Sequence, residues 1–407
     1  MAWEKVKLGD IAASVQTGPF GSQLHQSDYS EFGTPVVMPK DMIGGKILED
    51  SIARVEEQHV NRLSRHKVNV GDILYARRGD VGKCALVTEN EKGWLCGTGC
   101  LKVTIDFSKA NPKFVFYQLQ KPETVGWVEK HAVGATMLNL NTGILESIPI
   151  ELPKLNEQNK IVDILSAYDN LIENNQKQIK LLEEAAQRLY KQWFIDLRYP
   201  GHETTPIVDG LPEGWSITKI QDVCDNIGAG GTPSRSQKAF WQDGNIDWFK
   251  TQELCDCWLF ESTEKISEEG LKRSAAKMLP ANSILMAIYA SPTLGRLGIL
   301  TKEACSNQAA LCLQADESKV SNYWLYLKLF ELRDRFNSIA RGAGQQNISG
   351  IIVKETEITL PAYSVMENFT EMVKPFFEKQ RTLQLQNISL TQTRDRLLPK
   401  LMNGGVI

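Results

Sequence analysis

The sequence predicts a mixed α/β (α+β) fold with two pseudo-symmetric units, each followed by a long helix, and an antiparallel coiled coil between these helices. Three observations predict this fold. Residues 134–153 reappear as residues 342–361 at a constant offset (342 − 134 = 208, and 361 − 153 = 208). Short apolar runs typical of buried strands occur in both copies. After Pro153 and Pro361, apolar residues follow the spacing of a coiled coil.

The repeat extends upstream of its gapless part, where loops of different length interrupt it. A scaffold that is kept while its loops diverge is how one fold carries two different specificities. The matching segments are 3–11 with 215–223, 71–76 with 282–287, and 81–86 with 294–299.

Both kinds of secondary structure are predicted within each unit. Residues 73–76 and 284–287 are apolar runs bounded by turn residues, which predicts buried strands. Asn111, followed by Pro112, and Ser321 are capping residues at the start of amphipathic helical patterns. Each unit is therefore a mixed domain of about 150 residues.

The order of these segments gives the domain boundaries. Because Pro and Gly cluster near residues 200–214, this stretch is expected to be a linker between the two copies. The predicted domains are residues 1–153, a central helix over 154–198, the linker 199–214, a second domain over 215–361, and a distal helix with its tail over 362–407.

Both predicted long helices carry an apolar seam with positions four and three residues apart. Asn175 is a polar position in the first seam, and Pro375 predicts a start or a kink in the second. Packing of the two helices on each other is the expected role of this stripe. The pairing residues are Ile161, Leu165, Tyr168, Ile172, Ile179, Leu182 and Leu189 in the first helix, and Phe369, Val373, Phe376, Leu383, Leu390 and Leu397 in the second.

The length of these helices has a consequence for ligands. A helix of about 30 residues rises about 45 Å. Proteins that bind two DNA half-sites place them about 34–36 Å apart, one turn of the duplex. A spacer of that order between two domains suits a ligand with two sites a fixed distance apart.

Composition excludes several classes of protein. With 42% apolar and 23% charged residues, the 407-residue chain is an ordinary globular protein. No apolar run reaches the ~20 residues of a membrane span, and the N-terminus lacks a signal-peptide pattern, so a cytoplasmic location is expected. The eight cysteines fit a reducing compartment. Neither Cys96 with Cys100 nor Cys255 with Cys257 has zinc-knuckle spacing, so no metal site is expected.

Catalytic motifs are incomplete. Asn111-Pro112-Lys113-Phe114 lacks the second proline of the adenine methyltransferase loop and fits a helix cap. Residues 79–83 lack the glycine and hydroxyl positions of a phosphate loop. We therefore predict no catalytic residue and no cofactor of the chain's own.

Three short motifs accompany the two-copy layout: Trp215-Ser216-Ile217, Gly231-Thr232-Pro233-Ser234 followed by Phe240-Trp241, and residues 396–401. With these motifs, the chain resembles the specificity subunit of type I restriction–modification systems over essentially its whole length. The resemblance implies that each globular unit is a target-recognition domain for one half of a bipartite, asymmetric DNA sequence. It also implies that the helices set the spacing and dock two methyltransferase subunits, and that restriction subunits can join.

By the same resemblance, catalysis belongs to the partners. The methyltransferase would use S-adenosylmethionine on a flipped adenine, and the restriction subunit would use ATP and Mg. The remaining role of this chain would be to bind double-stranded DNA.

Residues that can contact DNA are Arg and Lys for guanine, Asn and Gln for adenine, and hydroxyls for phosphate. Arg77-Arg78 and Tyr289 occupy matching places in the two copies, where the loops diverge. The candidates are Thr17, Ser22, Gln23, Arg77, Arg78, Lys83 and Thr98 in the first unit, and Thr232, Ser234, Arg235, Lys238, Lys250, Gln252, Tyr289, Arg296, Arg341, Gln345, Gln346 and Asn347 in the second.

The formal net charge of −3 is unusual for a protein that binds DNA alone. A subunit of a larger complex can leave much of the phosphate neutralisation to its partners. Three alternatives stay open. The first is the specificity part of a related system with another effector enzyme, and the second is a tandem-domain coiled-coil adaptor that binds protein partners. The third is an enzyme, which is the weakest alternative because the catalytic motifs are incomplete.

Overall fold

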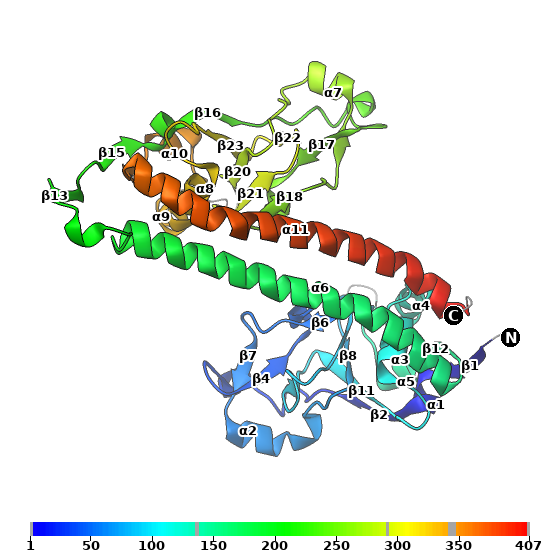
Figure 1. Cartoon of the computed structure of the whole chain (residues 1–407). Helices are drawn as coiled ribbons and strands as arrows, with labels where there is room; N and C mark the ends of the chain where they lie inside the picture. The colour runs from blue at the N-terminus through cyan, green and yellow to red at the C-terminus, as the bar shows by residue number, and fades with distance from the viewer. Residues whose placement is uncertain (1–2, 135–137, 290–292, 341–346, 405–407) are drawn as a thin grey trace. The chain divides into compact units, whose positions relative to one another are not determined.

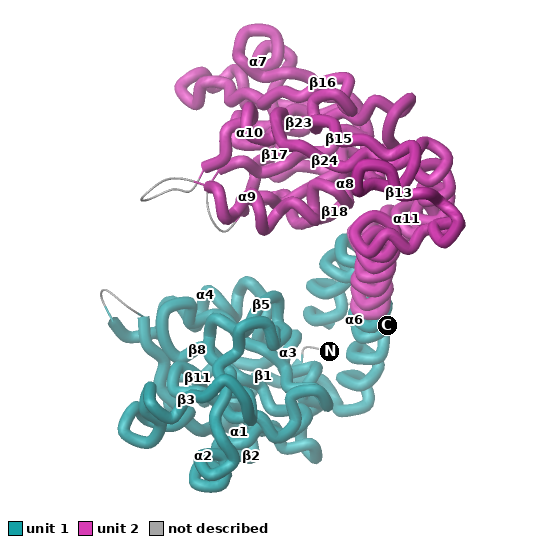
Figure 2. The backbone as a smooth tube through the Cα atoms, turned by 90° about the vertical axis from the view of Figure 1, so that its left-hand side faces the viewer, with its two compact units in different colours: residues 1–171, 390–407 teal, residues 172–389 magenta. Residues whose placement is uncertain are grey.

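The computed structural model describes residues 3–134, 138–289, 293–340 and 347–404. The chain divides into two units (Figure 2): unit 1 is Met1–Leu171 with Leu390–Ile407, and unit 2 is Ile172–Ser389. Each unit thus combines a globular α+β part with part of each long helix. The predicted fold class, with two similar α+β parts and two long helices, is confirmed.

In unit 1, two four-stranded sheets form the globular part (Figure 1). The first sheet is antiparallel, in the order β2 (Ala12–Thr17), β11 (Cys100–Ile105), β8 (Ile73–Ala76) and β9 (Cys84–Leu86). The second has the order β10 (Leu95–Cys96), β4 (Thr34–Val37), β7 (Ala53–Val55) and β3 (Tyr29–Ser30), with β10 parallel to β4.

Short elements complete unit 1. The strands are β1 (Glu4–Lys7), paired with β12 (Pro149–Leu152), and β5 (Met42–Ile43), paired with β6 (Lys46–Ile47). The helices are α1 (Leu8–Ile11), α2 (Glu57–Arg62), α3 (Pro112–Leu119), α4 (Pro122–His131) and α5 (Thr142–Glu146), with 3-10 turns at Gln26–Asp28, Pro39–Asp41 and Ser64–His66.

Unit 2 repeats this topology. Its main sheet has the order β16 (Cys224–Ala229), β23 (Ala310–Ala315), β20 (Ile284–Ala287), β21 (Leu297–Leu300) and β18 (Cys257–Leu259). A second sheet contains β19 (Lys265–Ile266), β17 (Ile246–Phe249) and β22 (Cys305–Ser306), with β22 parallel to β17 as β10 is to β4. Unit 2 adds β18 to its main sheet, and its second sheet has no described counterpart of β3. The other strands follow the same order in both units, so the repeat in the sequence is a repeat in the fold.

The remaining elements of unit 2 are short. The strands are β15 (Ser216–Lys219), paired with β24 (Glu357–Leu360), and the hairpin of β13 (Ile207–Val208) and β14 (Leu211–Pro212) within residues 199–214. The helices are α7 (Glu268–Lys272), α8 (Asn322–Glu331), α9 (Arg333–Ile339) and α10 (Gly350–Glu355). The 3-10 turns are η5 (His202–Thr204), η6 (Ile220–Val223), η7 (Lys238–Phe240) and η8 (Thr251–Glu253).

The predicted strands and capped helices form where the sequence places them. Residues 73–76 and 284–287 are the fully buried strands β8 and β20. The Asn111 side chain accepts a hydrogen bond from the backbone N–H of Lys113 at 2.9 Å. Ser321 caps α8 in the same way, which satisfies donors that a helix start would otherwise leave free.

The two long helices are α6 (Leu155–Tyr190), which ends in a π-helical turn at Lys191–Ile195, and α11 (Tyr363–Met402). Within unit 2, Asn175 donates a side-chain hydrogen bond to Asn387 at 2.9 Å, and Tyr190 packs edge-on against Phe369. From the first of these contacts to the second, the residue number rises on α6 and falls on α11. The helices therefore run antiparallel. The predicted start near Pro375 is wrong, since α11 begins at Tyr363 and stays helical past Pro375.

The pairing residues of the seam are buried or half-buried without exception. Packing rather than propensity stabilises helices of this kind. Ile161, Leu165, Ile172, Phe369, Val373 and Leu383 are buried, and Tyr168, Ile179, Leu182, Leu189, Phe376, Leu390 and Leu397 are half-buried. In the described part of the chain, no helix is long and apolar enough to cross a membrane.

Candidate nucleic-acid interface

The loop after β16 in unit 2 brings several predicted DNA contacts together, and two glycines position it. A Cβ added at Gly230 would lie 2.2 Å from the carbonyl oxygen of Ser306, and one at Gly231 would lie 2.0 Å from that of Ala275. Only glycine allows the backbone to approach these carbonyls so closely. The loop therefore leaves the sheet in a fixed direction.

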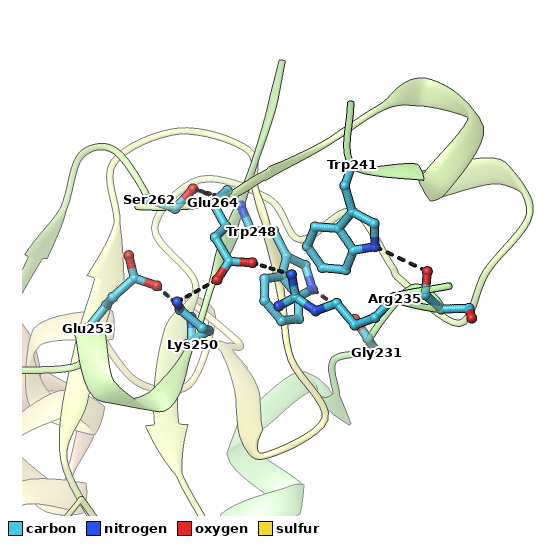
Figure 3. Close-up of polar contacts among 9 residues, drawn as sticks. Gly231, Arg235, Trp241, Trp248, Lys250, Glu253, Ser262 and Glu264 are labelled. Carbon is cyan, nitrogen blue, oxygen red and sulfur yellow. Dashed lines mark hydrogen bonds and ion pairs between the residues drawn. The ribbon is translucent and has the colours of Figure 1, made fainter. Parts of the chain in front are cut away.

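Two tryptophans hold the next part of the loop (Figure 3). Trp248 is buried and donates its indole N–H to the carbonyl of Gly231 at 2.9 Å, while Trp241 donates to the carbonyl of Ser234 at 3.2 Å. Their rings meet edge to face at 5.0 Å. Both bonds end on the loop backbone, so the tryptophans fix the loop that carries Arg235.

Arg235 lies over these rings. Its guanidinium carbon is 3.7 Å from the ring centroid of Trp241 and 5.3 Å from that of Trp248. One nitrogen forms an ion pair with Glu264, which leaves other donors of the planar group available. The side chain is 54% exposed. An arginine held this way is oriented before any ligand arrives.

Lys250 shares the same carboxylate (Figure 3). Its ammonium lies 2.7 Å from Glu264, and its backbone N–H donates to Glu253 at 2.7 Å. Hydrogen bonds from Lys250 and then Arg235 lower the pKa of Glu264 below its ordinary value. With two cations on one carboxylate, the Arg235–Lys250–Glu264 cluster keeps a net positive charge.

The other candidates of unit 2 are placed as follows. Thr232 donates to Gln308, Ser234 and Ser236 share a hydrogen bond of 2.9 Å, and Lys238 and Gln252 are exposed on η7 and η8. Tyr289 and Asn347 are exposed, and Arg296 is half-buried. Arg341, Gln345 and Gln346 lie outside the described residues.

In unit 1 the candidates are less closely connected. The Arg77 guanidinium lies 5.8 Å from the ring centroid of Phe20, which is 51% exposed. Gln23 accepts a hydrogen bond from the backbone of Phe20 at 3.0 Å, so it supports the same loop. The other candidates are exposed (Ser22, Arg78) or half-buried (Thr17, Lys83, Thr98).

The proposed correspondence between Arg78 and Tyr289 has a structural counterpart. Arg78 forms an isolated β-bridge with Asn139, and Tyr289 forms one with Asn347. The two asparagines are separated by the offset of the repeat (347 − 139 = 208). A cation therefore stands in one unit where an aromatic phenol stands in the other, as expected if the units read different bases.

Two residues that contact Arg235, Trp248 and Glu264, were not predicted as part of the site. Trp248 lies in an apolar strand, where an aromatic residue normally indicates core packing. Glu264 is 29 residues from Arg235, and a contact of that kind cannot be read from local spacing. Trp241 was visible in the Phe240-Trp241 motif but not as a partner of Arg235. Among the described residues, no group of three or more His, Cys, Asp or Glu could hold a metal ion.

Comparisons with known proteins agree on one family. Residues 2–184 and 212–388 match the model of the type I restriction modification DNA specificity domain. The chain is 22% identical to the type I restriction enzyme HindI specificity subunit of Haemophilus influenzae, over 99% of both chains. It is 24% identical to the MjaIX specificity subunit of Methanocaldococcus jannaschii, over 99% of this chain and 93% of the relative.

A solved structure shares the fold. The S subunit of a type I restriction–modification system from M. genitalium superposes with a TM-score of 0.60, at 16% identity, over 98% of this chain and 96% of that chain. The family model covers both repeats and most of the chain. The chain therefore belongs to the type I restriction–modification DNA specificity family.

Proposed function

We propose that this chain is the DNA sequence-specificity subunit of a type I restriction–modification complex, and that each globular part reads one half of a bipartite, asymmetric target. The Arg235–Lys250–Glu264 cluster carries the proposal, because it presents the exposed guanidinium of Arg235 on a rigid loop, beside the half-buried ammonium of Lys250. Such groups can contact phosphates or guanine edges. The paired bridges at Arg78 and Tyr289 support different readings by the two units.

We infer further that the helices set the spacing and dock two methyltransferase subunits, with restriction subunits able to join. The 36 residues of α6 correspond to about 54 Å of helix, enough to exceed one turn of duplex DNA. Exposed apolar side chains such as Leu171 and Leu181 on α6, and Leu385 on α11, support a docking role.

Chemistry is assigned to the partner subunits in this proposal. The methyltransferase would bind S-adenosylmethionine and flip the target adenine, and the restriction subunit would use ATP and Mg. The chain itself would contribute sequence reading and positioning. The complex would work in the cytoplasm, where the chromosome lies.

Methylome sequencing of cells that express the chain with its methyltransferase tests the proposal. A bipartite motif with modified adenine is the expected result, and no new motif would contradict it. Replacing residues 1–153 by the matching region of a relative should change one half of the motif only. A change in both halves would contradict the assignment of one half to each unit.

Binding by the isolated chain gives a second test. Its net charge of −3 predicts weak binding with a shallow salt dependence, because the partners supply most phosphate contacts. A gel-shift titration with tight, sequence-specific binding would contradict this division. Co-purification separates the proposal from the adaptor alternative, since a specificity subunit should retain two methyltransferase copies per chain.

A further inference from the structure

A cavity of about 210 Å³ lies within unit 2, among α6, α8, α11 and the turn before β18. Its walls include Tyr326 of α8 and Phe377 of α11, whose rings meet edge to face at 5.5 Å. Glu183 of α6, Gln380 of α11 and Cys255 also line it. At about 30 Å³ per water molecule, the space could hold roughly seven waters or a small organic group.

Two polar side chains of this cavity lack partners. Gln380 is only 5% exposed, yet it forms no hydrogen bond with any residue that the structure describes. Glu183 is half-buried, and it forms neither a hydrogen bond nor an ion pair with any of the described residues. The polar atoms of both side chains are open to the cavity rather than fully buried, so a ligand in the cavity can reach them.

The charge of the cavity indicates the kind of ligand. Asp256 is already neutralised, because Arg333 donates to it at 3.0 Å and through a second hydrogen bond. Glu183 has no such partner. Burial, then the charges of Asp256 and Glu184, raise its pKa to about 7, although the charge of Lys180 acts in the opposite direction. A cation placed beside Glu183 would relieve this unfavourable environment.

The walls favour an organic cation over a metal ion. Mg²⁺ and Ca²⁺ require about six or more oxygen ligands, whereas Glu183 is the one carboxylate of the cavity lining without a partner. Tyr326 and Phe377 instead present aromatic surface, which attracts ammonium and guanidinium groups and accommodates an apolar stem.

We propose that this cavity binds an organic cation, an alkylammonium or guanidinium group, with Glu183 as its counter-ion and the side-chain oxygen of Gln380 as a hydrogen-bond acceptor. Two sources present this chemistry: a small amine in solution, and a lysine or arginine side chain of another subunit. The site is separate from the Arg235–Lys250–Glu264 cluster and does not depend on the function proposed above.

Cys255 provides a reporter in the cavity wall, because it is exposed while the other seven cysteines are buried or half-buried. The experiment follows alkylation of Cys255 in the full chain by peptide mass spectrometry at a fixed pH. The probes are methylguanidinium and n-butylammonium, with n-butanol and sodium chloride as controls. Slower alkylation with the two cations alone is expected.

Variants decide whether the cavity is responsible. Glu183→Gln should raise the concentration of n-butylammonium needed for protection about tenfold, the effect of losing one charge-assisted bond. Glu367→Gln is the matched control, because this exposed carboxylate of α11 neither lines the cavity nor acts on Glu183, and it should leave protection nearly unchanged. Gln380→Leu, which removes the unpartnered amide without introducing a new one, should also weaken protection. Should Glu183→Gln fail to fold, Gln380→Leu decides the matter.

Two further arms identify the source. Protection by spermidine at low concentration supports a free amine, whereas protection of Cys255 in the assembled complex, lost with Glu183→Gln, supports a side chain of another subunit. The proposal is overturned if neither organic cation protects Cys255 more than n-butanol does, or if Glu183→Gln and Gln380→Leu leave that protection unchanged.

Discussion

Arg394 of α11 donates a hydrogen bond to Asp169 of α6 at 3.0 Å within unit 1. The hydroxyl of Tyr117 donates to the same carboxylate. At the repeat offset of 208, the counterparts of these helix residues are Ala186 and Phe377 (394 − 208 = 186, and 169 + 208 = 377), which are buried in the apolar core of unit 2. The helix pair therefore has a polar contact at these positions of unit 1 and buried apolar residues at the matching positions of unit 2.

Loss of this polar contact should destabilise unit 1. Asp169→Ala leaves Tyr117 and Arg394 without their shared acceptor, so we expect the free energy of unfolding to fall by about 2 kcal/mol. Urea denaturation would measure it. Glu268→Ala is the control, since its ion pair with Lys272 is exposed and should be worth less than about 0.5 kcal/mol. Equal effects of the two variants would contradict a structural role for Asp169.

Gly230 should tolerate no side chain, whereas Gly228 on the adjoining strand should. A Cβ at Gly230 would meet the Ser306 carbonyl at 2.2 Å, while one at Gly228 would meet nothing within 4 Å. We expect Gly230→Ala to cost about 2 kcal/mol or more and Gly228→Ala to be nearly neutral. Thermal unfolding compares the two, and similar melting temperatures would show that the loop can move away from β22.

The fold could be predicted because its signals are local or repeated. The offset of 208 relates Asn139 to Asn347, and both form the same β-bridge, so a repeat in sequence carried over to three dimensions. Of the two effects predicted for Pro375, a helix start is excluded, since the packing of a long helix outweighs the loss of one backbone hydrogen bond; a kink there stays a prediction. The pairing of Arg235 with Glu264 was not predictable, because the loop after β16 meets the end of β19 only once it has packed on Trp248 of β17.

Acid should destabilise the chain through His66. This residue is 2% exposed, and burial, then the charges of Arg65 and Lys102, lower its pKa to about 4. Below the unfolded value of about 6.5, the unfolded state binds a proton that the folded state does not. The stability that depends on neutral His66 is therefore complete above about pH 6.5 and falls by about 3 kcal/mol as the pH approaches 4.

The measurement compares urea denaturation at about pH 7 and about pH 5, an interval worth about 2 kcal/mol for His66. The variant His66→Gln should lose this part of the pH dependence, and His25→Gln, at an exposed position, should keep it. Comparing two pH values within each variant removes any general destabilisation by the substitution. An unchanged pH dependence in His66→Gln would contradict the assignment.

Glu264 should limit how strongly unit 2 attracts DNA. It holds Arg235 and Lys250 together, so a phosphate must compete with a carboxylate for both cations. Glu264→Gln removes the competing charge while keeping the size of the side chain. Arg235 would remain over Trp241, because that contact does not involve Glu264. We expect tighter binding with less discrimination between sequences, since phosphate contacts carry no sequence information.

Salt dependence measures the effect directly. In the assembled complex, the slope of log affinity against log salt concentration should steepen by about one for Glu264→Gln, as for one additional phosphate contact. Glu261→Gln is the matched control. Glu261 lies three residues before Glu264, and its substitution removes the same charge, but from an ion pair with Lys265. Adding Arg235→Ala to Glu264→Gln should return the slope toward its original value. Equal slopes for the two single variants would show that Glu264 acts only through the overall charge of the domain.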